Sequence, residues 1–201
     1  YETVRQAVQM VNSRSPKRRL ILLLLGESPD VETSDGLEVR SVGYHNDALI
    51  VAEHYRAADL YLHAAHADNF PTTVLEALSC ATPVVATGVG GIAEQVRSLS
   101  GLPGTDGGHD VTEATGALVA RSDPQAMAAA TSALLEDETL LSTLSRNAAE
   151  DAAQRFDVET QLDAVLAWYL QGAGKTWSDR AATALTVQIM NSGFFQQLRT
   201  E

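Results

Sequence analysis

The sequence has a single cysteine, no apolar run of membrane-spanning length and few basic residues. Cys80 is the one cysteine among 201 residues. This excludes an internal disulfide framework and a multi-cysteine zinc site, and it fits a reducing compartment. The longest apolar run, residues 20–25, is far shorter than the roughly 20 residues that span a bilayer. We therefore expect a buried strand there, and no insertion into a membrane.

Basic side chains are strongly outnumbered by acidic ones. The chain carries 14 Lys and Arg against 26 Asp and Glu, a formal net charge of -12. This balance argues against nucleic acid or an anionic membrane surface as the main partner. An anionic ligand would need local help at its site. The chain opens at Tyr1 directly with a helical pattern and has no initiator methionine, as expected of a segment from a larger protein.

What the sequence does contain is an alternation of strand and helix patterns. The apolar run that ends at Gly26 is typical of a strand covered on both faces in a parallel sheet. Residues 27–36 are predicted as a loop and residues 101–114 as an exposed, glycine-rich loop. Such alternation implies right-handed βαβ crossovers and a doubly wound α/β domain. The other predicted strands cover 37–43, 60–65, 83–87 and 115–120, and the helices between them cover 48–58, 72–80 and 91–98.

From residue 123 onward the patterns are helical only. Ser122 or Asp123 can cap a helix that has Pro124 at its first position, and two more helices are predicted over 138–156 and 157–171. The segment Gly-Ala-Gly-Lys at 172–175 breaks the last helix. We predict a domain over residues 1–171 and a tail over 172–201. Self-association through the apolar side chains of the tail, among them Trp177, Phe194 and Phe195, is a hypothesis.

The stretch from residue 67 to 91, ADNFPTTVLEALSCATPVVATGVGG, carries the chemistry. In an open parallel sheet, ligands bind outside the carboxyl ends of the strands, where loops lead into helices. Pro71 fits a first helical turn, and Asn69 is a good cap residue just before it. The N–H groups of Phe70, Thr72 and Thr73 would then be free at the helix start, where the helix dipole also favours a phosphate.

Two acids flank this helix start. Glu76 lies one turn deeper than Thr72 on the same helical face, and Asp68 lies in the loop ahead of it. A carboxylate only accepts hydrogen bonds, and two neighbouring sugar hydroxyls are a natural bidentate partner. The glycine turn that contains Gly90 and Gly91 would let the chain approach a ligand closely. These features indicate a nucleotide-sugar site. The alternative roles for the two carboxylates involve no ligand: a helix cap and a solvated surface acid.

The string DNFPTTVLEALSCATPVVATGVGGIAEQV resembles the E-x7-E region of retaining glycosyltransferases with the GT-B fold, the large group often called group-one or family-four glycosyltransferases. The resemblance covers about residues 1–170 and implies a Rossmann-like donor-binding lobe followed by C-terminal helices. It implies that Glu76 binds the ribose hydroxyls and Asp68 the donor sugar, as the acids of the catalytic centre. The remaining donor contacts implied by the resemblance are Asn69, Phe70, Thr72 and Thr73 for the diphosphate and sugar, Gly43 to His45 for the base, and Gly90 and Gly91 for the other wall.

The resemblance further implies a UDP- or GDP-sugar donor, with no metal or other cofactor required. The family's acceptor-binding N-terminal lobe is not in this sequence, nor is the basic pair of its G-R-x-KG segment, so the fragment alone should be inactive. Its tail would be the crossover helix to the missing lobe. Asp68 is one methylene shorter than the usual glutamate, and Pro71 stands where many relatives have glycine. Both differences alter the expected contacts to the sugar.

Other functions remain open at this point. A non-catalytic domain that keeps the fold for regulation or protein interaction is the main alternative, while a GT-B epimerase would need acid and histidine motifs that are not found. His63 and His66 could be read as metal ligands, but satisfied polar histidines are the better prediction. We expect a cytoplasmic location, with peripheral membrane attachment of the intact enzyme as an alternative.

Overall fold

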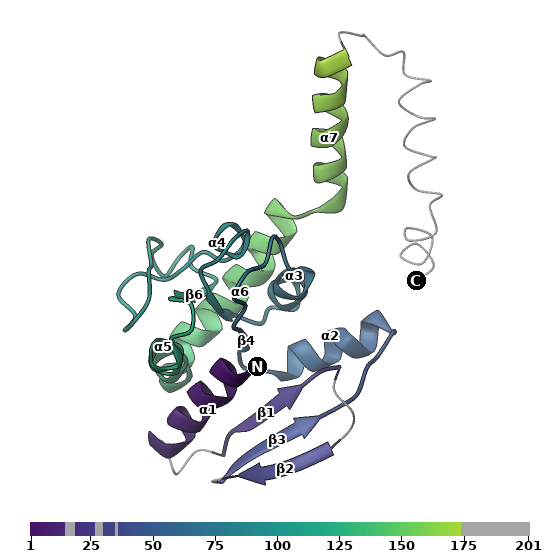
Figure 1. The fold of residues 1–201 in the computed structure, drawn as a ribbon. Coiled ribbons are helices and arrows are strands. Elements are labelled where there is room, and N and C mark those ends of the chain that lie inside the picture. Colours follow the sequence, from purple (N-terminus) through teal and green to yellow (C-terminus); the bar gives the residue numbers. More distant parts are fainter. Residues whose placement is uncertain (15–18, 27–29, 35, 174–201) are drawn as a thin grey trace. The chain divides into compact units, whose positions relative to one another are not determined.

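The computed structural model describes residues 1–14, 19–26, 30–34 and 36–173 (Figure 1). The chain divides into two compact units, residues 1–156 and residues 157–201. The second unit contributes one described helix, α7 (Val158–Ala173). The tail predicted over 172–201 lies almost wholly outside the described residues, so that division stays a prediction. The elements of the first unit are α1 (Glu2–Arg14), β1 (Ile21–Leu24), β2 (Asp30–Ser34), β3 (Leu37–Ser41), α2 (Ala48–Ala57), β4 (Tyr61–His63), α3 (Thr72–Ser79), β5 (Val84–Thr87), α4 (Ile92–Gln95), β6 (Gly116–Val119), α5 (Pro124–Glu136) and α6 (Glu138–Arg155).

The strands form two three-stranded sheets with the orders β1-β3-β2 and β4-β5-β6. The pairs β1–β3, β4–β5 and β5–β6 are parallel. This confirms the predicted α/β class with parallel strands, although β1 and β3 have the strand β2 between them in the chain and not a helix. The strand β2 was missed, because its polar sequence DVETS was predicted as part of a loop. It pairs antiparallel to β3 through a turn in which Gly36 has a φ of 76°, a conformation that suits glycine.

The sheet β4-β5-β6 separates two cores because successive side chains of a strand point to opposite faces. In β5, Val85 belongs to a core shared with α1 and α5, whereas Val84 and Ala86 belong to a second core shared with α3 and α6. In β6, Val119 and Leu118 divide in the same way. Helices therefore cover both faces of this sheet, which is the predicted doubly wound arrangement. In β1, by contrast, Ile21 is 45% exposed and Leu22 is buried, so the prediction of a strand covered on both faces is wrong for the run that ends at Gly26.

Side-chain caps fix the starts of three helices in the first unit. Asp47 caps α2 and accepts from the N–H of Leu49. Asp123 accepts from the N–H of Ala126 and is followed by Pro124 at the first helical position, as predicted. Asp137, which the sequence had not singled out, caps α6 in the same manner. Each such cap satisfies an N–H group that has no partner within its helix.

The short helix α4 and the segment after it differ from the prediction. Residues 91–98 were predicted as one helix, but α4 ends at Gln95 and the chain then becomes extended at Val96. Ser98 and Leu99 instead form single bridges to Gly116 and His109. The loop that follows, residues 101–114, is largely exposed, as predicted. The helical pattern failed here because backbone pairing with β6 competes successfully with a very short helix.

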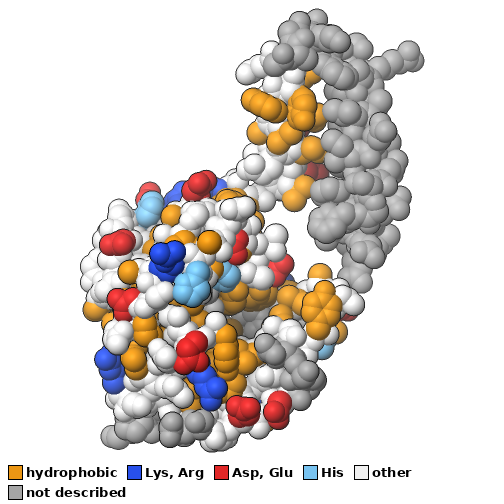
Figure 2. All heavy atoms as spheres, viewed as in Figure 1, with side chains coloured by type: hydrophobic (Ala, Val, Ile, Leu, Met, Phe, Trp, Pro, Cys, Tyr) orange, Lys and Arg blue, Asp and Glu red, His pale blue; other side chains and the backbone are white. Residues whose placement is uncertain are grey.

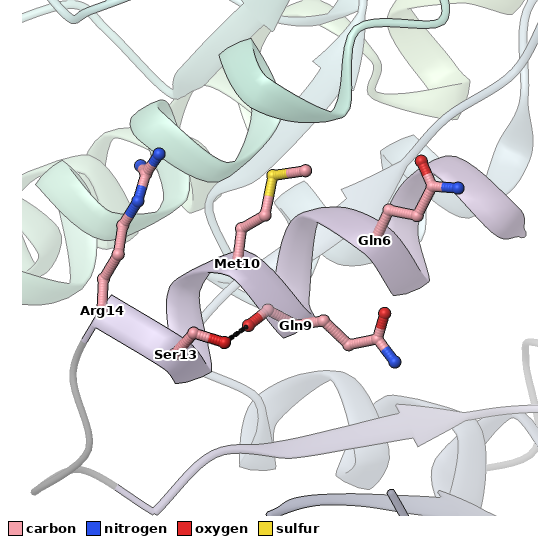
Figure 3. A pocket seen from close by; sticks show the side chains of 5 residues that line it. All are labelled: Gln6, Gln9, Met10, Ser13 and Arg14. Carbon is pink, nitrogen blue, oxygen red and sulfur yellow. Dashed lines mark hydrogen bonds between the residues drawn. The ribbon is translucent and has the colours of Figure 1, made fainter. Parts of the chain in front are cut away.

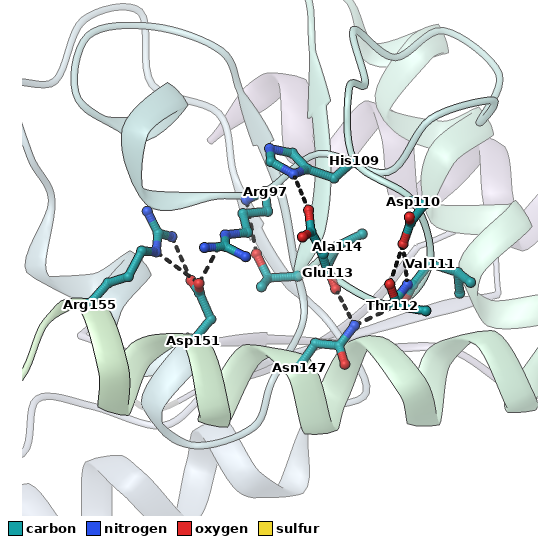
Figure 4. A network of polar contacts seen from close by, with 11 residues as sticks. Arg97, His109, Asp110, Val111, Thr112, Glu113, Ala114, Asn147, Asp151 and Arg155 are labelled. Atoms are coloured by element: carbon teal, nitrogen blue, oxygen red, sulfur yellow. Dashed lines mark hydrogen bonds and ion pairs between the residues drawn. The ribbon is translucent and has the colours of Figure 1, made fainter.

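The C-terminal turn of α6 is fastened to α4 by a buried acid (Figure 4). Asp151 is 7% exposed and pairs with Arg97 at 3.0 Å and with Arg155 at 2.5 Å. The Arg155 guanidinium also donates to the main-chain carbonyls of Glu94 and Gln95, at 2.8 Å each. Because one acid satisfies two arginines, this network fixes α4 against α6.

No helix among the described residues is long and apolar enough to cross a membrane. On the face drawn in Figure 2, acidic, basic and histidine side chains of the first unit lie in small separate groups among apolar ones. This is the pattern of a dispersed surface charge.

Replacing the buried acid tests the network. Asp151→Ala should lower the free energy of unfolding by about 2 kcal/mol, because removing one partner leaves two cations poorly paired, and their partial exposure moderates the loss. Urea denaturation would measure it. Glu150→Ala, an exposed acid on the same helix, serves as the control and should change stability by less than about 0.5 kcal/mol. Equal effects of the two variants would contradict this account.

Candidate functional site

The candidate site lies where β4 ends and α3 begins. β1 and β4 are each at one edge of their sheets, whose strand orders are β1-β3-β2 and β4-β5-β6. Leu24 of β1 and Leu62 of β4 pack against the same core. The carboxyl end of a parallel strand, where a loop leads into a helix, is the usual ligand position in doubly wound sheets.

The start of α3 differs in detail from the prediction. Pro71 is itself the N-cap residue, with φ -67° and ψ 127°, and the helix begins at Thr72. Asn69 lies two residues before this cap position, and its main-chain carbonyl accepts from the N–H of Gly91 at 2.8 Å. The Pro71 carbonyl accepts from the Gln95 side chain at 3.0 Å. The loop is thus held from α4, and the cap position carries no side-chain oxygen.

The three amides proposed for an anion keep their hydrogen-bonding capacity. Within the described part of the chain, no hydrogen bond uses the main-chain N–H groups of Phe70, Thr72 or Thr73. Phe70 and Thr72 are exposed, whereas Thr73 is half-buried. Helix N-terminal N–H groups of this kind can bind an anion together with the helix dipole.

Glu76 lies beside two tyrosines, Tyr55 and Tyr61, that were not predicted as site residues. Its Oε2 accepts from the Tyr55 hydroxyl of α2 at 3.2 Å. The rings of Tyr55 and Tyr61 meet edge to face at 5.5 Å. Burial holds the pKa of the Tyr55 phenol well above its usual range, and it also raises the pKa of Tyr61, against the lowering effect of a hydrogen bond from Thr73. Both phenols are therefore neutral donors at neutral pH.

Asp68 lies near a histidine whose role had been predicted differently. His63 Nε2 is 3.8 Å from the Asp68 Oδ2, and the His63 side chain is 17% exposed. The Nε2 atom is buried and has no hydrogen-bond partner among the residues that the structure describes, whereas Nδ1 contacts the Tyr61 hydroxyl, so His63 is satisfied at one ring nitrogen and not, as predicted, at both. His66 lies near Ser122, with 3.4 Å between its Nδ1 and the serine oxygen. Burial lowers the pKa of the His63 imidazole, and the nearby Asp68 carboxylate partly offsets this.

Gly90 and Gly91 lie very close to the main chain of Asp68 and Asn69. A Cβ on Gly90 would lie 1.9 Å from the Asp68 carbonyl oxygen, and one on Gly91 would lie 2.0 Å from the Asn69 carbonyl oxygen. Gly90 also has a φ of 52°. The N–H of Gly91, predicted to be free for a ligand, is used by Asn69. The close approach that requires glycine at these two positions is therefore made to the loop carrying Asp68.

The residues predicted near the base lie in the segment between β3 and α2. Gly43 has a φ of 81°, and its carbonyl accepts from the N–H of Gly26 at 2.8 Å, which joins the ends of β3 and β1. His45 contacts the Val42 carbonyl and stacks on His54 of α2 with ring centroids 5.5 Å apart. Because His54 precedes Tyr55, this loop and Glu76 contact neighbouring positions of one helix.

The other surface features are weaker candidates for a ligand site. An open hollow of about 310 Å³ is lined by side chains of α1 alone: Gln6, Gln9, Met10, Ser13 and Arg14 (Figure 3). The hydrogen bond drawn there joins Ser13 to the Gln9 carbonyl. Among the described residues, no group of three or more His, Cys, Asp or Glu is placed to hold a metal ion.

Tyr55, Tyr61 and His63 could have been found from the sequence only in part. Tyr61 and His63 alternate in a predicted strand, which puts both on one face, the face that α3 covers. Tyr55 is separated from Glu76 by 20 residues, and its contact depends on how α2 packs on α3, which no local pattern reports.

Comparison with solved structures defines the class. Anabaena HepE in complex with UDP superposes with a TM-score of 0.52 at 28% identity, over 64% of this chain and 32% of that chain. Sucrose-phosphate synthase from Thermosynechococcus elongatus superposes with a TM-score of 0.61 at 24% identity, over 86% of this chain and 43% of that chain. The fold is that of GT-B glycosyltransferases.

Sequence comparison defines the family. Residues 1–137 match the family described as glycosyl transferases group 1, and the chain belongs to it. D-inositol 3-phosphate glycosyltransferase of Kineococcus radiotolerans is 36% identical over 132 residues, which are 66% of this chain and 29% of that protein. The lipopolysaccharide core biosynthesis mannosyltransferase LpsB of Rhizobium meliloti is 33% identical over 137 residues, 65% of this chain and 36% of that protein. The chain thus spans about a third of the length of these relatives.

The glycine turn can be tested separately from any ligand. Gly91→Ala should lower the free energy of unfolding by about 2 to 3 kcal/mol, because the new methyl group overlaps the Asn69 carbonyl. Gly88→Ala is the matched control, since a Cβ there meets Leu118 Cβ at an ordinary 3.7 Å. Thermal and urea unfolding of both variants would compare them. A Gly91→Ala protein as stable as Gly88→Ala would show that the turn does not hold the Asp68 loop.

Proposed function

We propose that this chain is the nucleotide-sugar-binding lobe of a retaining glycosyltransferase, which transfers a sugar from a UDP or GDP donor to an acceptor. One observation carries the proposal: in a chain of the group 1 family, the acids of the D-x7-E motif lie on either side of an unobstructed helix start. The Anabaena neighbour superposed above was solved with UDP, which supports a nucleotide ligand for the same fold.

The diphosphate is assigned to the start of α3. The amides of Phe70, Thr72 and Thr73 have no partner within the described ranges of the chain, and the helix dipole adds to their attraction for an anion. Such local attraction is needed because the chain as a whole, with a net charge of -12, repels an anion. A phosphate can be held here by main-chain groups, with the basic pair of the preceding family segment as a further partner in the intact protein.

The two acids are assigned to hydroxyl groups at opposite ends of the donor. Glu76 lies four residues inside α3, and the Tyr55 hydroxyl occupies one side of its carboxylate, which leaves other acceptor positions for the ribose. Asp68, 34% exposed, is assigned to the sugar. The segment from Gly43 to His45 is assigned to the base, since its stacking on α2 places it beside the helix that contacts Glu76.

In the proposed reaction the bond between the anomeric carbon and the diphosphate oxygen breaks, and a bond to an acceptor oxygen forms with the same anomeric configuration. The acceptor loses a proton, and the nucleoside diphosphate leaves. Charge that develops on the leaving diphosphate would be stabilised by the amides at the start of α3. In this proposal the acceptor site belongs to an N-terminal lobe. The proposed enzyme is cytoplasmic and requires no metal.

Glu76→Ala tests the ribose assignment. In the full-length protein this change should weaken binding of UDP or GDP about 30-fold, equivalent to roughly 2 kcal/mol, because a charged hydrogen-bond acceptor for two hydroxyls is lost. Isothermal titration calorimetry would measure it.

Glu53→Ala removes an exposed acid from α2 and is the control for the change in net charge. It should leave the affinity within about twofold, because surface charges act weakly at a distance. A folded full-length protein that binds neither UDP nor GDP would overturn the proposed function and favour a non-catalytic domain.

A further inference from the structure

The strand β4 places a histidine between the two acids of the site. Tyr61 and His63 alternate on the face covered by α3, and the Tyr61 hydroxyl lies 3.1 Å from His63 Nδ1. The Tyr61 hydroxyl can donate its proton to this nitrogen. A neutral His63 that accepts the proton at Nδ1 carries its own proton on Nε2.

This Nε2–H group finds no hydrogen-bond partner in the part of the chain that the structure describes. The atom is buried, and the nearest carboxylate oxygen recorded for it is Asp68 Oδ2 at 3.8 Å. A hydrogen bond between such groups spans about 2.7–2.9 Å, so the gap exceeds it by roughly 1 Å. A buried donor without a partner is costly, and Asp68 is the acceptor that could relieve the cost.

The backbone of Asp68 leaves only its side chain free to close this gap. Its carbonyl is packed against Gly90, where even a Cβ would overlap it. The carboxylate is partly exposed and can rotate. Movement of this side chain is therefore the way in which the hydrogen bond can form.

We infer that His63 is the positioning residue of the donor site: its Nε2–H orients the Asp68 carboxylate toward the donor sugar. That this carboxylate meets a sugar rests on the proposed function, whereas the pairing of His63 with Asp68 does not. The groups recorded in contact with His63 are Tyr61 on its own strand and Asp68 on the loop. Thr73, Glu76 and Tyr55 act on Tyr61, one residue further along this face. Asp68 is the one among them that lies near Nε2.

The pairing is tested first without ligand. In the full-length protein, long-range ¹H–¹⁵N correlation spectra of the imidazoles should show His63 protonated on Nε2 alone near neutral pH. In Asp68→Asn the pKa of His63 should fall, because a negative charge that favours the protonated ring is lost. A ring protonated on Nδ1, or a pKa unchanged by Asp68→Asn, would overturn the inference.

The positioning role is tested by binding of UDP, UDP-glucose, GDP and GDP-mannose. His63→Phe should reduce the affinity for the nucleotide sugar about tenfold relative to the nucleotide alone. His63→Gln, which retains a donor near the Nε2 position, should recover most of this loss. Equal losses for nucleotide and nucleotide sugar, or no recovery in His63→Gln, would indicate a structural role and contradict the inference.

The two levels of the proposal fail differently. If the wild-type protein binds none of these compounds, the proposed function is wrong, and the imidazole spectra still decide whether His63 and Asp68 are paired. If the wild type binds them and the variants behave as the control Glu53→Ala does, the proposed function stands and the role of His63 is refuted.

Discussion

The close approach of the Gly90–Gly91 turn to the Asp68–Phe70 loop is the constraint on which the candidate site depends. Backbone meets backbone there at distances that allow no Cβ. The N–H of Gly91 and the side chain of Gln95 hold the carbonyls of Asn69 and Pro71. The loop is thus fixed by its own carbonyl groups, which leaves the N–H groups at the start of α3 available.

The same region is supported from behind by the C-terminal end of α6. Arg155 holds carbonyls of α4, and Phe156 meets the ring of Phe70 edge to face at 6.0 Å. A strand, a glycine turn, a short helix and a distant helix therefore converge on one loop. Asp68 lies in this loop, and Glu76 lies in the helix that follows it. The two acids have different protein neighbours: the Tyr55 hydroxyl donates to Glu76, and His63 lies near Asp68.

Much of the fold could be predicted from the sequence because the controlling signals are local. Unbroken apolar runs gave the parallel strands, and Asp123 followed by Pro124 gave the start of α5. The polar edge strand β2 was missed, because an edge strand buries little and its stabilisation comes from pairing with β3. The glycine pair was recognised as a close approach, but the partner was assigned to a ligand, since only the folded chain shows that Asn69 lies there.

The central claim is that a nucleoside diphosphate binds at the start of α3 between Asp68 and Glu76. A crystal structure of the full-length protein with UDP or GDP tests it most directly. The account predicts phosphate oxygens within hydrogen-bond distance of the Thr72 and Thr73 amides and both ribose hydroxyls on Glu76. A nucleotide bound elsewhere, with the start of α3 and Glu76 making no contact to it, would contradict the account.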